Sequence, residues 1–427
     1  MLLRRSPEPS GSLEVEVIAS WRELFRTSAS RKNPAHRHSA RILRREACED
    51  RVADALQRPA VTAGPAPRSS SATLRILPRP CNPPAVPPRV VMPSPASRPV
   101  RPTVCIITPA LRASNTGNWH AAARWARFLR PDYRVRVLDA WDNEPCDVLI
   151  ALHARRSADS IAAFRAAHPD RGLGVVLTGT DLYRDLPANR EAQRSLDWAD
   201  RLVVLQELAV QALPAHYRTK TTVIFQSAPA LKRGARRRRT FDVVVVGHLR
   251  DEKDPLTAMR AALALPAASS VRVLHAGAAH DERYAVAARR TESRTSRYRW
   301  LGELTRARAR QLMSHAALLL HPSKMEGGSQ AVLEAIRSST PVLVSNSDGN
   351  VGMVGNRYPG VFRVGNVREV VELMQRASTD RAFLRRLASA CRARAWLFSP
   401  KVERAAVRDL VHQLLHNRAV QRRKVSK

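Results

Sequence analysis

The feature that most constrains this chain is an alternation of short apolar runs with amphipathic stretches, which begins abruptly at "TVCIITPA", Thr103 to Ala110. Short apolar runs that end in Gly, Pro or Ser indicate buried strands, and the periodicity of stretches such as "HAAARWARFLR" indicates helices. The alternation stops in a basic, loop-like segment, residues 221–240, and restarts at "FDVVVVGHLRDEKDP". Such alternation is typical of parallel sheets covered on both faces. The sequence therefore predicts an α/β protein with two Rossmann-like doubly wound domains facing a cleft.

The expected domain boundaries follow from these breaks. Fifteen of the 29 prolines lie in the first hundred residues, which have too little apolar periodicity to build a core. We predict an N-terminal extension, 1–100, that is disordered or reflects a mis-called start. We predict Rossmann-like domains at 101–228 and 229–400, then a C-terminal helix and basic tail at 401–427. The basic linker, 232–239, has no predicted role.

Composition limits the classes of function. The net charge of +35 invites a nucleic-acid interpretation, but only eight of the 72 basic residues are lysine, and aromatic residues make up just 5% of the chain. We therefore expect no specific nucleic-acid binding. No apolar run is long enough to span a bilayer, and no secretory signal is recognisable. The five cysteines are scattered, which predicts neither a disulfide framework nor a zinc site and favours the cytoplasm.

Two motifs in the second domain carry candidate chemistry at the ends of strands. In "GHLRDEKDP", Gly247 allows close approach of a ligand, and Arg250 and Lys253 precede a helix that starts near Asp254 and Pro255. Cations beside a helix N-terminus suit a diphosphate, although two solvated loop cations are the alternative.

The second motif is "HPSKMEGGSQAVLEAI", in which Glu326, Gly327 and Gly328 follow a buried strand. Glu334 then lies in a helix predicted over 330–337. Two glutamates eight residues apart are often accidental, so the position at a strand end carries more weight than the spacing.

Polar residues also follow the strands of the first domain and are expected to face the same cleft. Each has a structural alternative: Gly117 and Asn118 could simply cap a helix, His153 could be a structural histidine, and Asp181 could be an N-cap. The candidate acceptor-binding residues are Gly117, Asn118, His153, Arg155, Thr178, Gly179, Thr180 and Asp181. No D-x-D element or Walker-type loop is present in the sequence, so neither a nucleotide-bound metal nor ATP hydrolysis is predicted.

These motifs, on two Rossmann-like domains, resemble those of a metal-independent, retaining glycosyltransferase of the GT4 type, and the resemblance implies the GT-B fold. A closer resemblance is to the selenosugar synthase (SenB) family of selenoneine biosynthesis. It is carried by six motifs, in this order: "GNWHAAARWARFL", "VVLTGTDLYRDL", "VGHLRDEKDP", "YRWLGEL", "HPSKMEGG" and "GNVGMVG". The resemblance covers about residues 103 to 400.

The resemblance implies transfer from UDP-N-acetylglucosamine to selenophosphate, giving a 1-selenosugar, UDP and phosphate. It implies no cofactor, since the UDP-sugar is a substrate, and possible partners among pathway enzymes. Arg250 and Lys253 would hold the diphosphate, Glu326 the donor sugar and Glu334 the ribose. Amides of Gly327, Gly328 and a "GNVGM" loop would support the phosphates.

Two other functions remain open. A generic GT4 enzyme would act on a lipid or polysaccharide acceptor, and the helix carrying Trp125 and Phe128 would be its membrane patch unless those side chains are core. A non-catalytic polyanion-binding protein would use the arginines and show salt-sensitive binding.

Overall fold

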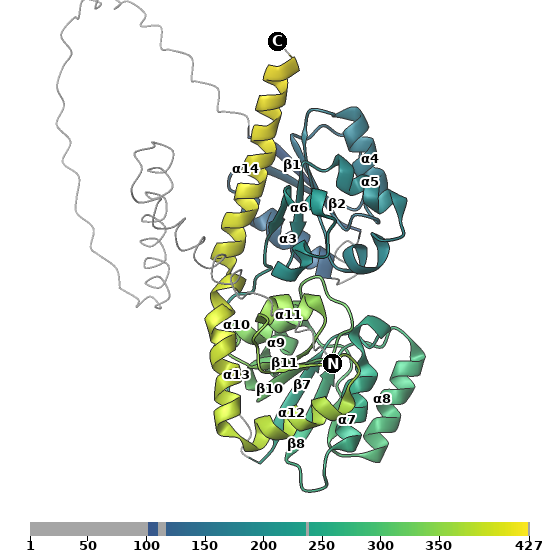
Figure 1. Ribbon diagram of the computed structural model, residues 1–427, viewed down its shortest axis with the longest axis vertical. Coiled ribbons are helices and arrows are strands. Elements are labelled where there is room, and N and C mark those ends of the chain that lie inside the picture. Colours follow the sequence, from purple (N-terminus) through teal and green to yellow (C-terminus); the bar gives the residue numbers. More distant parts are fainter. Residues whose placement is uncertain (1–100, 110–116, 236–238, 426–427) are drawn as a thin grey trace, which may run out of the picture. The chain divides into compact units, whose positions relative to one another are not determined.

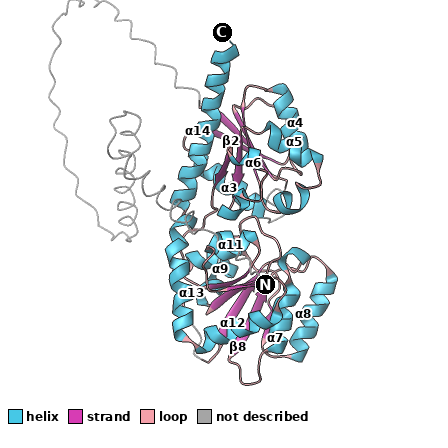
Figure 2. Cartoon of the chain, viewed as in Figure 1, coloured by secondary structure: helices cyan, strands magenta, loops and turns pink. Residues whose placement is uncertain are grey.

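A computed structural model describes residues 101–109, 117–235 and 239–425, with the backbone alone described over 417–425. It contains two parallel sheets of six strands each, with flanking helices (Figures 1 and 2). The predicted doubly wound fold is confirmed. The predicted N-terminal extension, 1–100, lies outside the described residues, and so do 110–116 in the first domain.

The first sheet has the strand order β2-β1-β3-β4-β5-β6, and every pairing is parallel. Its strands are β1 (Thr103–Ile107), β2 (Arg134–Leu138), β3 (Val148–Leu152), β4 (Gly172–Val176), β5 (Arg201–Val204) and β6 (Thr221–Val223). Its helices are α3 (Gly117–Leu129), α4 (Ala158–Ala167), α5 (Arg190–Trp198) and α6 (Ala215–Arg218).

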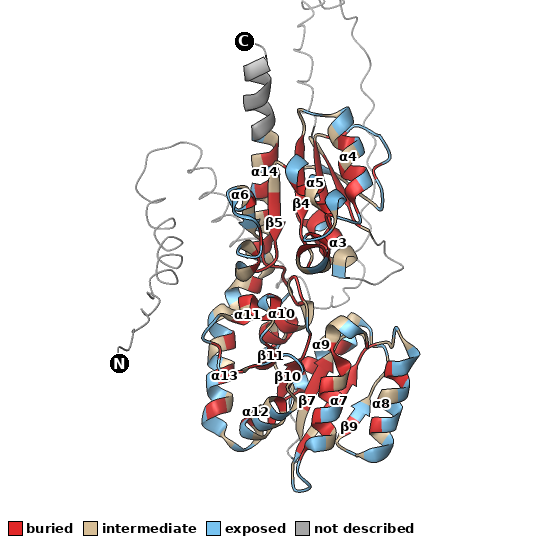
Figure 3. Ribbon diagram, turned by 45° about the vertical axis from the view of Figure 1, so that its right-hand side comes forward, coloured by how far each residue is buried: buried red, intermediate tan, exposed pale blue. Residues whose placement is uncertain are grey.

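Both faces of this sheet are buried, as the continuous apolar strands predict. Along β1, Val104 and Ile106 join one core cluster while Cys105 and Ile107 join another, because successive side chains point to opposite faces. Every residue of β3 is buried. Figure 3 shows this pattern, with buried strands and helices whose outer faces are exposed.

The second sheet has the order β12-β11-β10-β7-β8-β9 and is also parallel throughout. Its strands are β7 (Phe241–Val246), β8 (Val271–Ala276), β9 (Tyr298–Trp300), β10 (Leu318–His321), β11 (Val342–Ser345) and β12 (Val361–Phe362). Its helices are α7 (Pro255–Ala264), α8 (Glu282–Arg294), α9 (Arg306–His315), α10 (Gln330–Arg337), α11 (Asp348–Val354), α12 (Val367–Thr379) and α13 (Arg381–Arg394).

Two sequence predictions of local structure are wrong. Thr221–Val223, expected to be loop, forms the edge strand β6, which is short and only partly buried and so has a weak apolar pattern. The "GNVGM" segment, expected to be loop, lies inside helix α11. Its glycines disfavour a helix intrinsically, but close packing requires them. A Cβ on Gly349 would lie 1.8 Å from the carbonyl oxygen of Glu326.

The last helix, α14 (Pro400–Val425), returns to the first sheet and packs on α3 and β4 (Figure 1, yellow). Its side chains Val407, Leu410, Val411 and Leu414 complete the core on that face. Its Glu403 is 1% exposed. The C-terminal helix expected at 401–427 is therefore part of the first domain's packing. Among the described helices, none has the length and apolar character needed to cross a membrane.

Part of the basic linker has a structural role. Arg233 donates from Nη2 to the carbonyl oxygen of Ala316 at 3.1 Å, just beyond the end of α9, and from Nη1 to that of Ser339, beyond α10. Carbonyl groups at helix C-termini lack intrahelical partners and attract cations. The Arg233 guanidinium group therefore binds the linker to the C-terminal ends of α9 and α10.

Candidate functional site

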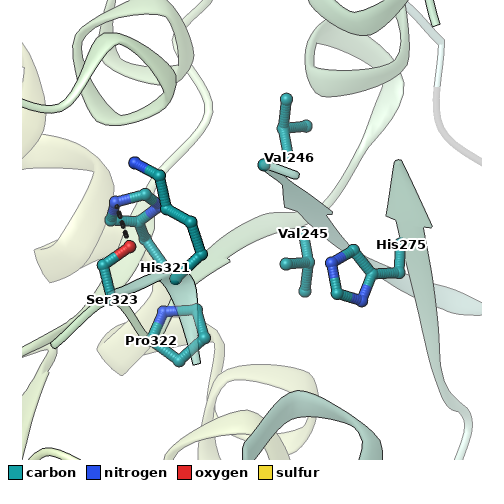
Figure 4. A pocket seen from close by; sticks show the side chains of 8 residues that line it. Val245, Val246, His275, His321, Pro322 and Ser323 are labelled. Carbon is teal, nitrogen blue, oxygen red and sulfur yellow. Dashed lines mark hydrogen bonds between the residues drawn. The ribbon is translucent and has the colours of Figure 1, made fainter. Parts of the chain in front are cut away.

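The donor side of the candidate site lies at the carboxyl ends of the neighbouring strands β7 and β10. Gly247 follows β7, and His321 ends β10 just before the Gly-rich loop. A small pocket opens between these strand ends (Figure 4). Its lining residues are Val245, Val246, Gly247, Lys253, His275, His321, Pro322 and Ser323.

Glu326 is the centre of a buried polar network beside this pocket. Its Oε1 pairs with Lys253 Nζ and accepts a hydrogen bond from His321 Nε2 at 2.8 Å. Burial would raise the pKa of Glu326, but Lys253 and His321 outweigh it and hold that pKa well below the usual range. Burial lowers the pKa of His321, so its imidazole is neutral and carries its proton on Nε2. The hydroxyls of Ser323 and Ser329 lie 3.1 and 2.9 Å from this nitrogen.

Glu334 is anchored in a similar way on the following helix, α10. Its Oε1 accepts from Arg306 Nε at 2.7 Å and from Gln330 Nε2 at 2.9 Å. For Glu326 and Glu334 alike, Oε1 takes every hydrogen bond from described residues and Oε2 has no such partner. Both side chains are buried, with 9% and 4% exposed. Each carboxylate is therefore held by a cation through one oxygen and keeps acceptor capacity on the other.

Arg250 lies near this network but is held loosely. Its side chain is 43% exposed, and its Nε is 3.7 Å from Glu252 Oε2, too long for a hydrogen bond. The same Nε is buried without a hydrogen-bond partner among the described residues. Asp254, in the left-handed region at φ 46°, then turns the chain into α7, which starts at Pro255 as predicted. Arg250 and Lys253 thus flank one turn before a helix.

Gly327 and Gly328 are explained by packing. A Cβ on Gly327 would lie 2.2 Å from the carbonyl oxygen of Thr178, and one on Gly328 would lie 2.7 Å from Leu205 Cβ. Gly179 faces Gly327 in turn, and a Cβ there would lie 2.5 Å from the Gly327 nitrogen. These glycines let the loop after β10 lie against the segments after β4 and β5. Their proposed contact with phosphate stays a prediction.

On the acceptor side, Asp181 is a scaffold residue. It is fully buried, and its Oδ1 accepts from the amides of Thr178 and Gly179, each at 2.8 Å. Its Oδ2 accepts from the amide of Ala154 at 3.0 Å. Asp181 therefore ties the loops after β3 and β4 together. Thr178 and Gly179 were candidate acceptor-binding residues, and their amides already have this partner.

His153 strengthens the same connection. It adopts a left-handed backbone conformation, φ 73°, which is costly for a residue with a Cβ. Its Nε2 lies 3.1 Å from Thr180 Oγ1, and its Nδ1 accepts from the Arg156 amide at 3.3 Å. Burial lowers the pKa of His153, which favours the neutral ring. A structural role is thus sufficient to explain His153.

The remaining acceptor candidates are placed less closely. Gly117 and Asn118 form the first turn of α3, and the loop before them, 110–116, lies outside the described residues. The side chain of Arg155 is 51% exposed after β3. On α3, Trp125 and Phe128 are 1% and 7% exposed, so both belong to the core.

Sequence reasoning missed four residues that the structure brings to these sites. His321 and Arg306 hold the two glutamates, while Arg184 and Asp185 lie beside Arg155. Arg184 and Asp185 are within the quoted "TGTDLYRD" motif, so their position after a strand was an available signal. Nothing in the local pattern connects Arg306 to a glutamate 28 residues away. Among the described residues, no group of three or more His, Cys, Asp or Glu side chains is arranged to hold a metal ion.

Comparisons with known proteins support the fold and the class of enzyme. Residues 230–423 match the family model described as "Glycosyl transferases group 1". HepE of Anabaena, solved in complex with UDP and glucose, is 14% identical with a TM-score of 0.59, over 73% of this chain and 100% of that chain. Sucrose-phosphate synthase from Thermosynechococcus elongatus is 14% identical with a TM-score of 0.59, over 74% of this chain and 100% of that chain. A glycosyltransferase from Rickettsia africae is 12% identical with a TM-score of 0.56, over 74% of this chain and 99% of that chain. At such identities the structures establish a shared fold.

Proposed function

We propose that this chain, a glycosyltransferase whose residues 230–423 belong to the group-1 family, joins the sugar of UDP-N-acetylglucosamine to selenophosphate. The observation that carries the donor half is the buried Glu326 carboxylate, held by Lys253 and His321 with its Oε2 unpartnered among the described residues. The acceptor half is supported by the series of motifs similar to the selenosugar synthase family.

The proposed donor roles follow from charge. Lys253 and Arg250 bind the diphosphate, which leaves with developing negative charge, so cations fixed there stabilise the transition state more than the ground state. Glu326 accepts from hydroxyls of the donor sugar through Oε2, and Glu334 does the same for the ribose. Gly247 has no side chain, which leaves its backbone open to the nucleotide, and a Cβ there would make only an ordinary contact with Lys253 at 3.7 Å.

The reaction balances as two bond exchanges. A selenium lone pair attacks C1 of the sugar from the same face that the diphosphate leaves, as retention requires, while the bond from C1 to the diphosphate oxygen breaks and UDP leaves with that electron pair. Water then cleaves the Se–P bond. Its oxygen remains on phosphate and a proton goes to selenium, giving the 1-selenosugar. Selenophosphate is already anionic, so the first step needs no strong general base, in keeping with a retaining mechanism.

One assay tests this function. The purified chain is incubated with UDP-N-acetylglucosamine and selenophosphate, and UDP and a selenium-containing sugar are sought by mass spectrometry. We expect both products in equal amounts. Glu326→Ala, which removes the carboxylate, should abolish both. UDP release that requires a lipid or glycan acceptor, with none from selenophosphate, would refute the proposal.

A lipid acceptor has less support. The helix predicted as its membrane patch, α3, turns Trp125 and Phe128 into the core. No other observation favours a lipid or polysaccharide acceptor. The non-enzymatic, polyanion-binding alternative is set aside because the chain is a glycosyltransferase. We further propose a cytoplasmic location, with enzymes that make selenophosphate or consume the selenosugar as partners.

A further inference from the structure

Two arginines in the first domain converge on one buried carboxylate. Asp185 Oδ1 lies 3.1 Å from Arg184 Nε and 3.5 Å from Arg155 Nη1. The Asp185 side chain is 5% exposed, whereas those of Arg155 and Arg184 are 51% and 47% exposed. The carboxylate is therefore the fixed member, and the two guanidinium groups extend from it toward solvent.

Hydrogen bonds connect the segments that carry these arginines, and Arg184 lies in a short π-helical turn, Asp181–Asp185. Arg155 follows β3 and Arg184 follows β4, and Asp181 joins the two loops by accepting from the amides of Ala154 and Gly179. His153 adds a second connection through Thr180 Oγ1 at 3.1 Å. Because the backbone is held on both sides, the pair of guanidinium groups is organised before any ligand binds.

The two guanidinium groups of this cluster keep donors that could bind a ligand. Two guanidinium groups share one carboxylate, and the Nη2 of each has no partner among the described residues. Arg184 also pairs with Glu252 at 3.3 Å, with 47% and 27% of the two side chains exposed. Such exposed pairs are weak and exchangeable. An incoming anion can therefore replace Glu252 while Asp185 stays in place.

We propose that Arg155 and Arg184, held by Asp185, bind the oxyanion end of the glycosyl acceptor, a phosphate-like group. Planar guanidinium groups match the oxygens of a phosphate better than other side chains do. A neutral lipid or glycan hydroxyl would not compensate the charge that Arg184 loses when Glu252 is displaced, whereas an oxyanion would. The inference rests on the proposed function for the identity of the acceptor. Arg184 and Asp185 are the residues it adds to that site, Asp185 as a positioning residue.

Binding of inorganic phosphate, measured by calorimetry with saturating UDP present, tests the site apart from turnover. UDP occupies the donor diphosphate site, so phosphate reports on the acceptor side. Hydrogen bonds between charged groups predict that Arg184→Ala or Arg155→Ala weakens phosphate binding by about 10- to 100-fold, with UDP affinity unchanged. Arg156→Ala is the matched control. Arg156 is a neighbour that is also exposed, with no side-chain hydrogen bond or ion pair among the described residues, so its removal should change phosphate affinity less than about twofold.

Two further variants sharpen the test. Asp185→Asn should weaken phosphate binding like an arginine deletion and raise the acceptor KM while leaving kcat at saturation unchanged. Glu252→Gln should strengthen binding by up to about fivefold, because it removes the competing carboxylate.

Phosphate affinity that is the same in Arg184→Ala as in the wild type would overturn the inference, even if selenosugar forms. Loss of phosphate binding in both arginine variants, with no selenosugar from the wild type, would support the oxyanion site and refute the selenophosphate acceptor instead.

Discussion

Glu326→Gln is the most informative single substitution, because it removes a charge while preserving side-chain size. In the wild type, Glu326 is ionised between Lys253 and the Nε2–H of His321. The amide retains a carbonyl oxygen for His321 but leaves Lys253 without its counter-ion. Lys253 is only 21% exposed, so water compensates this loss in part.

The size of the effect follows from these exposures. Exposed ion pairs contribute about 0–1 kcal/mol, and breaking a fully buried pair costs about 3–5 kcal/mol. With side chains 21% and 9% exposed, the Lys253–Glu326 pair lies between these limits. We expect the free energy of unfolding to fall by about 2–3 kcal/mol and Tm to fall by about 4–10 °C. Losing a charged ligand contact should lower kcat/KM by about 10- to 100-fold.

The stabilising effect of Glu326 should depend on pH. The folded-state pKa of Glu326 is lowered, so its contribution is complete above the unfolded pKa of about 4.3 and is lost as the pH falls through the folded value. The difference in Tm between wild type and Glu326→Gln should therefore be full at pH 7 and shrink below about pH 4. His321, whose pKa is lowered by burial, opposes folding at low pH in both proteins.

Thermal unfolding of both proteins across this pH range is the assay. Glu372→Gln is the control, because it breaks the exposed Arg368–Glu372 pair, whose side chains are 88% and 58% exposed. We expect that control to shift Tm by less than about 2 °C at any pH. A Glu326→Gln protein that melts like the control at pH 7, or whose deficit does not change with pH, would refute this account of the network.

The remaining predictions concern packing and the second glutamate. Gly327→Ala should lower both Tm and activity, because its Cβ would lie 2.2 Å from a backbone oxygen of the first domain, and unchanged thermal unfolding would contradict that close contact. Glu403→Gln should lower the free energy of unfolding, measured by chemical denaturation, by about 3–5 kcal/mol, because it breaks a pair with Arg124 in which the Glu403 and Arg124 side chains are 0% and 5% exposed. A decrease below about 1 kcal/mol would contradict this prediction. Arg306→Ala should raise the KM for the UDP-sugar several-fold by releasing Glu334, with a smaller effect on kcat, and a change confined to kcat would argue against that positioning role.

Local sequence information was sufficient for the architecture and for many element boundaries. The helix predicted over 330–337 is α10 itself, because Ser329 caps it and the apolar period runs to its end. The helix predicted at Asp254–Pro255 also starts there. Both signals act within a few residues along the chain, which is why they are readable without a structure. They also placed Glu326 and Lys253 at strand ends.

Tertiary structure decided what those strand ends contact. The pairing of Lys253 with Glu326 spans 73 residues, and that of Arg155 with Asp185 spans 30, so neither follows from local periodicity. Helix α11 contains glycines, which disfavour a helix, and packing explains one of them: Gly349 lies against the backbone of Glu326 and leaves no room for a Cβ. The sequence determined most of the strands and helices, with β6 and α11 as exceptions, since apolar periodicity and capping act within a few residues. The fold alone determined which charges share a site, because distances between separate elements depend on how the sheets pack.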